Sequence, residues 1–179
     1  MNHTKYITPA AFASAHGATA PALVPNRKLI ERPETRPRVM VLHPIDEHLG
    51  KLLTILNNCH YRVEWTTTVG EAMALLGGNP IPLVLCDSSL EDGSWRDLAK
   101  QVRGLKSPPL ILVTARLADD ALWIEVLDGG GFDVLAEPFE PLQVAHVVSV
   151  ALDWWHESRV MLREAGFYGG SSRSRSHQA

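Results

Sequence analysis

Four polar residues stand at the ends of short apolar runs: His43, Asp87, Thr114 and Glu137. An imidazole placed between two carboxylates can carry a proton for both, because neighbouring carboxylates repel and raise one another's pKa. The same imidazole and carboxylates are suitable ligands for zinc or manganese. Either chemistry requires a fold that brings together residues far apart in the sequence.

The segments that carry these residues alternate between strand and helix patterns. Short runs rich in Val, Ile and Leu predict strands, while apolar residues at helical spacing and capping signals predict helices. The predicted strands are 38–42, 61–65, 82–86, 110–114 and 132–135, and the predicted helices are 49–56, 68–76, 94–105, 119–127 and a long last helix from Pro141. The alternation predicts an α/β fold, a doubly wound five-stranded parallel sheet covered on both faces. Such sheets bind ligands beyond the carboxyl ends of their strands, where the polar residues then meet.

Four motifs in this region resemble the receiver domain of two-component response regulators. They are LVLCD at 83–87, LEDG at 90–93 (LPDG in the family), LILVTA at 110–115, and GGFDVLAEPF at 130–139 (GAxDYLxKPF in the family). The resemblance covers about residues 37–155 and implies a receiver, or flavodoxin-like, sheet of strand order 2-1-3-4-5. It implies that Asp87 is the phosphoacceptor. The pocket around that carboxylate would contain His43, Pro44, Ser89, Thr114, Ala115, Glu137 and Pro138.

The chain departs from the family pattern in three features. His43 and Pro44 stand where the family has two adjacent acids that help to hold a magnesium ion. Glu137 stands where the family has a lysine, and Val134 stands at its aromatic switch position. The resemblance therefore implies the fold more strongly than it implies the family's usual chemistry.

These departures predict that magnesium-dependent phosphorylation is impaired. Magnesium prefers oxygen ligands, and only Asp87, the Ser89 carbonyl and water are expected to offer them. Glu137 opposes a phosphoryl group, and a pair of unit charges ~4 Å apart at an effective dielectric constant of ~20 is worth of order 4 kcal/mol. We expect no cofactor beyond weak magnesium binding at Asp87. A rearranged loop would be needed to bring in Asp46 or Glu47 as a replacement acid.

The sequence of the altered pocket allows three interpretations. His43 locks the site by carrying a proton between Asp87 and Glu137, or the pocket has drifted without a role, or the three residues bind a metal. The main functional hypothesis is a divergent signalling module that acts through protein contacts. The alternative is a working phosphoacceptor at Asp87 in a histidine–aspartate phosphorelay. An enzyme is not expected, because no GxGxxG or Walker loop is found after a strand.

Composition excludes several classes of protein. The chain has 179 residues, 45% of them hydrophobic and 21% charged, with a formal net charge of -3. The negative charge argues against a dedicated nucleic-acid binder, and two cysteines do not make a disulfide scaffold. No apolar run approaches the ~18 residues of a membrane helix. We expect a cytoplasmic protein that binds neither nucleic acid nor membranes.

The ends of the chain differ from its middle in composition. Residues 1–36 are predicted to be a disordered arm and 169–179 a disordered tail, because both lack a hydrophobic period. Between them lie the receiver-like domain, 37–155, and a helical extension, 156–168. Trp154 and Trp155 are adjacent on the last helix and cannot both face the core fully. They are candidate anchors for a homodimer or for a protein partner such as a histidine kinase or another regulator.

Overall fold

A five-stranded parallel sheet forms the centre of the computed structural model, which describes residues 36–78 and 80–164. Its strands are β1 (Arg38–Leu42), β2 (Arg62–Thr66), β3 (Leu83–Asp87), β6 (Leu110–Ala115) and β7 (Asp133–Ala136). They lie in the order β2-β1-β3-β6-β7, which is the predicted order 2-1-3-4-5 once the strands of this sheet are counted along the chain. The fold class and the strand order predicted from the sequence are confirmed.

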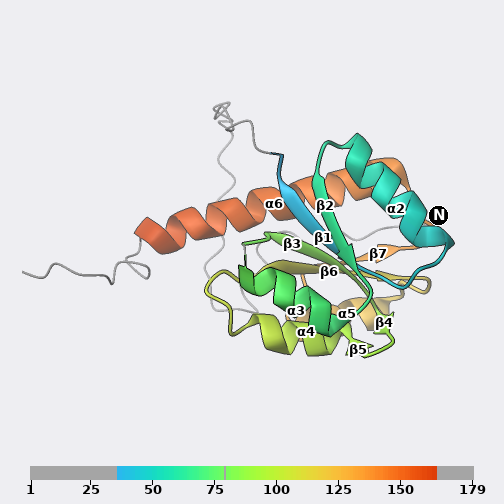
Figure 1. The fold of residues 1–179 in the computed structure, drawn as a ribbon, viewed down its shortest axis with the longest axis horizontal. Helices are drawn as coiled ribbons and strands as arrows, with labels where there is room; N and C mark the ends of the chain where they lie inside the picture. The colour runs from blue at the N-terminus through green and yellow to red at the C-terminus, as the bar shows by residue number, and fades with distance from the viewer. Residues whose placement is uncertain (1–35, 79, 165–179) are drawn as a thin grey trace, which may run out of the picture.

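Helices cover both faces of this sheet. They are α2 (Glu47–Asn58), α3 (Val69–Gly78), α4 (Trp95–Val102), α5 (Asp120–Asp128) and α6 (Pro141–Glu164). Figure 1 shows α2 and α6 on one side of the sheet and α3, α4 and α5 on the other. Each face therefore has its own hydrophobic core, as expected for parallel strands that are buried on both sides.

Alternate residues of each strand belong to opposite cores. In β1, Val39 and Val41 pack with α2 and α6, while Met40 and Leu42 pack with α3, α4 and α5. This alternation follows from the two-residue period of a strand. Cys86, the residue before Asp87, enters the second core, where burial raises the pKa of its thiol. Such a buried thiol is expected to be inert.

The structure differs from the sequence prediction mainly at element boundaries. The LEDG stretch forms a small hairpin, β4 (Ser89–Leu90) with β5 (Gly93–Ser94), where the sequence predicts no strands. The sequence of Thr68 and Glu71 resembles a capping box before α3, but only half of such a box forms. Thr68 Oγ1 accepts a hydrogen bond from the Glu71 backbone N–H at 3.3 Å, whereas the Glu71 carboxylate accepts one from the Thr66 hydroxyl.

The last helix continues past residue 155 as far as Glu164. Trp154 and Trp155 are both half-buried and pack against the first core. The Trp154 ring lies 6.3 Å from that of Phe132, and Trp155 Nε1 donates a hydrogen bond to the Pro108 carbonyl at 3.0 Å. Both rings are partly covered by the domain and partly exposed, as expected for adjacent residues that cannot both face the core fully. Their role as anchors for a partner stays a prediction.

The predicted disordered segments and the end of the predicted helical extension, 165–168, lie outside the described residues, apart from Arg36. Within 36–78 and 80–164, no helix combines the length and the apolar character needed to cross a membrane.

A turn of three glycines connects α5 to β7. Gly130 has a φ of 91°, a conformation that residues with a side chain rarely adopt. A Cβ on Gly129 would lie 2.4 Å from the Trp95 ring, and one on Gly131 would lie 2.4 Å from Val126 Cγ1. This turn is required for close packing between α5 and the start of β7.

We predict that Gly131→Ala destabilises the protein by about 1–3 kcal/mol, because the new methyl group overpacks the core against Val126. Gly50→Ala is the matched control. Gly50 lies in α2, where a Cβ would meet no neighbouring atom within 4 Å, and alanine there should stabilise by about 0.5–1 kcal/mol. Denaturant unfolding measures both values, and a neutral Gly131→Ala would contradict the packing shown by the structure.

Candidate functional site

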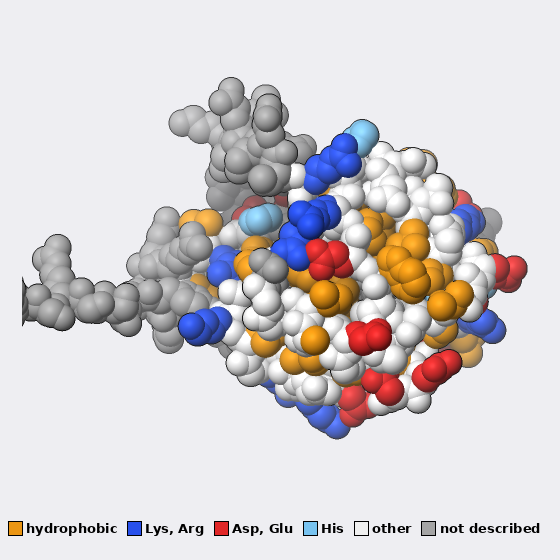
Figure 2. All heavy atoms as spheres, viewed as in Figure 1, with side chains coloured by type: hydrophobic (Ala, Val, Ile, Leu, Met, Phe, Trp, Pro, Cys, Tyr) orange, Lys and Arg blue, Asp and Glu red, His pale blue; other side chains and the backbone are white. Residues whose placement is uncertain are grey.

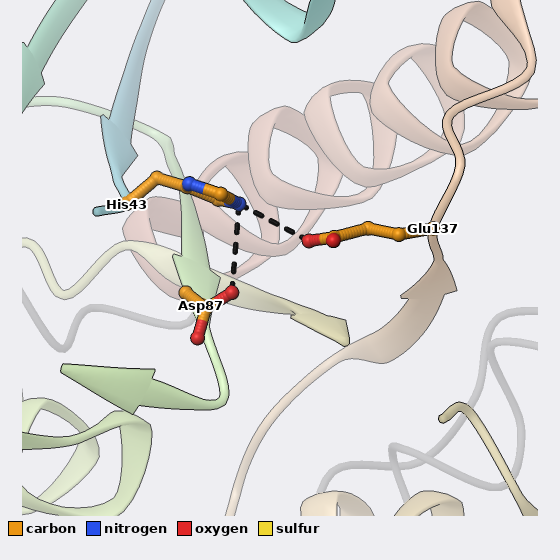
Figure 3. Close-up of side chains that lie close together, drawn as sticks. All are labelled: His43, Asp87 and Glu137. Carbon is orange, nitrogen blue, oxygen red and sulfur yellow. Dashed lines mark hydrogen bonds and ion pairs between the residues drawn. The ribbon is translucent and has the colours of Figure 1, made fainter. Parts of the chain in front are cut away.

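Three side chains converge at the carboxyl-terminal edge of the sheet. His43 follows β1, Asp87 is the last residue of β3, and Glu137 follows β7. His43 Nε2 lies 3.1 Å from Glu137 Oε1 and 3.5 Å from Asp87 Oδ2. Figure 3 shows the imidazole of His43 directed at both carboxylates. The side chains of His43 and Glu137 are each only 1% exposed.

Hydrogen bonding fixes where His43 carries its protons. The Nδ1 atom lies 2.9 Å from the Pro44 carbonyl oxygen, which can only accept, so Nδ1 carries a hydrogen and donates it. The opposite nitrogen, Nε2, faces carboxylate oxygens, which favours a second proton on the ring. Burial alone would lower the pKa of His43, but the Pro44 and Glu137 hydrogen bonds and the charges of Asp87 and Asp46 raise it overall. The carboxylates that face Nε2 and the raised pKa therefore both favour the cationic form of the imidazole between the two acids.

Asp87 is held from both sides. Its Oδ1 accepts a hydrogen bond from the Ser89 backbone N–H at 2.7 Å, while Oδ2 faces His43. Burial raises the pKa of Asp87, and the charges of Glu137 and Asp46 add to that rise. The Ser89 hydrogen bond and the charge of His43 oppose it without cancelling it. The Asp87 side chain remains 16% exposed, so one side of the site is open to solvent.

Two residues that sequence analysis missed lie on the outer side of Glu137. Glu137 Oε2 is 3.7 Å from His48 Nε2 and 3.9 Å from Arg116 Nε. Arg116 comes directly after β6, so the rule that selected the ends of strands would have found it. His48 is in the first turn of α2 and carries no such signal. The Arg116 side chain is 77% exposed, which leaves His43 as the buried partner of the carboxylate.

The two acids considered as replacements do not rebuild an acidic pair. Asp46 caps α2 by accepting hydrogen bonds from the backbone N–H groups of His48 and Leu49, at 2.9 and 3.0 Å. Its slight burial would raise its pKa, but the Leu49 N–H and the charge of His43 lower the pKa overall. The side chain of Glu47 is 88% exposed and lies outside the site.

The remaining predicted pocket residues line the same edge. Thr114 is paired in register with Asp87 across β3 and β6, and its hydroxyl is buried with no hydrogen-bond partner among the described residues. The Ala115 carbonyl accepts a hydrogen bond from the backbone N–H of Glu137 at 2.9 Å. The Glu137–Pro138 peptide bond is cis. Val134, at the switch position, is buried in the second core.

The geometry can be compared with what a magnesium ion requires. Magnesium takes oxygen ligands in near-octahedral geometry. Here Asp87 Oδ1 accepts the hydrogen bond from Ser89, and Asp87 Oδ2 lies 3.5 Å from His43 Nε2. A cationic imidazole at this position repels a magnesium ion. The Asp46 carboxylate is engaged by backbone N–H groups. This donor set does not fit magnesium.

Solved structures share this fold with the chain. The signal receiver domain of a protein assigned as a LuxO repressor in Vibrio parahaemolyticus has a TM-score of 0.65 and 16% identity, and the match covers 71% of this chain and 98% of that one. A protein from Chloroflexus aurantiacus assigned as a response regulator has a TM-score of 0.63 and 24% identity, over 66% and 99% of the two chains.

The beryllofluoride-activated NtrC4 receiver domain, solved as a dimer, is also similar. It has a TM-score of 0.61 and 17% identity, and the match covers 66% of this chain and 98% of that one. No protein-family model and no curated protein matches the chain. The chain therefore has the fold of receiver domains, with a sequence far from theirs.

The buried contact between His43 and Glu137 leads to a first prediction for the site. His43→Leu should destabilise the protein by about 3–5 kcal/mol, because it leaves two carboxylates without their buried cation. Combining it with Glu137→Gln removes one of those charges, so the double variant should lose less than the sum of the two single losses. The expected coupling is about 0.5–3 kcal/mol. Denaturant unfolding of all three variants tests this, and additive losses would contradict the charge pairing.

The raised pKa of His43 predicts a pH dependence of definite sign. A group whose pKa is raised on folding contributes stability that is fully present below its ordinary pKa, here 6.5, and is lost as the pH rises through the raised value. The difference in unfolding free energy between the wild type and His43→Leu should therefore be largest below pH 6.5 and shrink as the pH rises above 6.5 through the raised value. A chelator in the buffer keeps stray metal ions out of the measurement. A difference that stays constant across this range would show that His43 does not titrate as described.

Proposed function

We propose that this chain is a signalling protein of two-component type that acts through protein contacts and without standard magnesium-dependent phosphorylation. The observation that carries the proposal is the position of His43 Nε2 between the Asp87 and Glu137 carboxylates. The imidazole takes the place of a metal ion as the cation of the site. The receiver fold supports the signalling role, and the altered site sets this protein apart from the usual reaction of that fold.

The charges at the site support this proposal. Phosphoryl transfer to a carboxylate relies on positioning and on cations that neutralise the transferred group. Glu137 is buried beside the acceptor and adds negative charge in place of a lysine. Arg116 contacts Glu137 and Asp46 instead of Asp87 and is largely exposed, so it is a weak substitute.

A restored variant tests the proposal. This triple variant regains the two acids and the lysine of the receiver pattern through the substitutions His43→Asp, Pro44→Asp and Glu137→Lys. We expect the backbone amide spectrum of the wild type to be unchanged by millimolar magnesium with beryllofluoride, a phosphate mimic. The restored variant should show saturable shifts around Asp87, Ser88 and Thr114 that spread to α5 and β7.

Asp87→Asn in the restored background is the matched control and should abolish those shifts. Saturable shifts in the wild type at the same concentrations would sink the proposal, because they would show that the native pocket accepts both magnesium and the phosphate mimic. The restored variant must first show a dispersed amide spectrum like that of the wild type, so that a failure to fold is not mistaken for a missing response.

One observation favours the second candidate function, a phosphoacceptor at Asp87 in a phosphorelay. The buried Thr114 hydroxyl is available to donate a hydrogen bond, and it lies on the strand position paired with Asp87. Asp87 is also open enough to meet a donor. Incorporation of phosphate from acetyl phosphate or a histidine kinase into the wild type, and not into Asp87→Asn, would support this function over the first.

The partner of the proposed signalling protein is a second copy of the chain or another regulator that contacts α6. Figure 1 shows this helix extending beyond the sheet, and its exposed apolar residues there are Val160, Met161 and Leu162. On the face drawn in Figure 2, hydrophobic side chains are instead interspersed with charged ones in small groups. Receiver domains can be dimers, as the NtrC4 structure is.

We predict that Val160→Glu with Leu162→Glu reduces self-association, because two charges would have to be buried in the contact. Leu142→Glu, at the exposed start of the same helix, is the matched control. Sedimentation should show a dimer for the wild type and the control and a monomer for the double variant. A monomeric wild type would exclude the homodimer and leave another regulator as the partner.

A further inference from the structure

We propose that His43, Asp87 and Glu137 bind a divalent transition-metal ion of the zinc class, in place of the magnesium that the site does not suit. The inference rests on the proposed function, since the metal ion would regulate the same site. One donor atom from each of these three side chains lies within 4.8 Å of the other two.

The two spacings that involve His43 approach those of a tetrahedral zinc site, and the two carboxylates lie within 4.8 Å of one another. With metal–ligand bonds of about 2.0–2.1 Å, neighbouring donors around zinc lie about 3.3 Å apart. His43 Nε2 is 3.1 Å from Glu137 Oε1 and 3.5 Å from Asp87 Oδ2. Small side-chain movements would therefore place the three donors around one ion.

The hydrogen bond of His43 prepares it as a ligand. Metal-binding histidines usually donate their other ring N–H to a carbonyl or a carboxylate, which fixes the tautomer and the ring orientation. Here Nδ1–H donates to the Pro44 carbonyl, so Nε2 is the nitrogen that remains for a metal. The ring of the buried Phe139 also packs against the imidazole, with centroids 6.2 Å apart, which limits its rotation.

Charge and ligand type select the class of metal. One imidazole with two carboxylates suits zinc and its neighbours, whereas magnesium prefers oxygen alone. When the ion binds, the Nε2–H bond of His43 is broken, the proton leaves to solvent, and the Nε2 electron pair forms the bond to the metal. The two carboxylates then balance the charge of the divalent ion.

The site has a route of entry and a position for a fourth ligand. Asp87 and His48 have side chains that are 16% and 19% exposed, so the edge of the sheet is partly open between them. Three protein ligands with water in the fourth position match the pattern of open zinc sites. His48 Nε2 lies 3.7 Å from Glu137 Oε2, the carboxylate oxygen that does not face His43, and helps to hold the carboxylate in place.

Zinc binding is tested on the full chain after treatment with a chelator. Competition with a chromogenic chelator at neutral pH should give one zinc ion per chain, with no displacement by millimolar magnesium. Cobalt, used as a spectroscopic probe, should give the visible absorption of a four-coordinate site. His43→Leu and Glu137→Gln should each weaken zinc binding at least about tenfold. Even substitutions of residues that only hydrogen-bond to a metal ligand reduce metal affinity by about that much.

His146→Gln is the matched control, because His146 lies exposed on α6 away from the cluster, and its affinity for zinc should equal that of the wild type. Asp87→Asn gives a third test of the ligand set should either first variant fail to fold. Equal zinc affinity in the wild type and in folded His43→Leu and Glu137→Gln would overturn the inference, as would an equal loss in His146→Gln. If only the zinc inference is wrong, zinc will not bind but the wild type will still show no shifts with magnesium and beryllofluoride. The two proposals can therefore fail separately.

Discussion

A buried imidazole between two buried or half-buried carboxylates is the interaction on which this site depends. Asp87 and Glu137 come from β3 and from the end of β7, and their charges would repel at this distance without a cation between them. His43, at the end of β1, provides that cation when its imidazole is protonated, and its raised pKa favours this form. The edge of the sheet is therefore held together by electrostatics that a phosphoryl group would disturb.

The two hydrophobic cores make this arrangement possible. Packing on both faces fixes the strands, so their carboxyl ends cannot separate to relieve the repulsion between the acids. The negative charge of a carboxylate at the end of one strand must instead be neutralised by a side chain from the end of another strand. The same rigidity would favour the proposed zinc-class ion, since a preorganised set of ligands loses little freedom when it binds.

The sequence predicts the sheet well because each buried strand is a short apolar run and each helix has a clear hydrophobic period. It also predicts that His43, Asp87 and Glu137 occupy one edge, since that follows from parallel strands alone. It does not predict the distances between them, the cap that occupies Asp46, or the approach of His48 and Arg116. These depend on how the loop after β1 and the start of α2 are placed, and no periodic pattern encodes that placement.

The long last helix has a mechanical consequence. Its first half is held on the sheet by Val144, Val148 and Leu152, while the residues after Trp155 extend as a rod of about 13 Å at 1.5 Å per residue. A rod converts rotation at its base into translation at its tip. A tilt of about 5° would move the tip by about 1 Å, so a small rearrangement at the sheet becomes a displacement that a bound protein can sense.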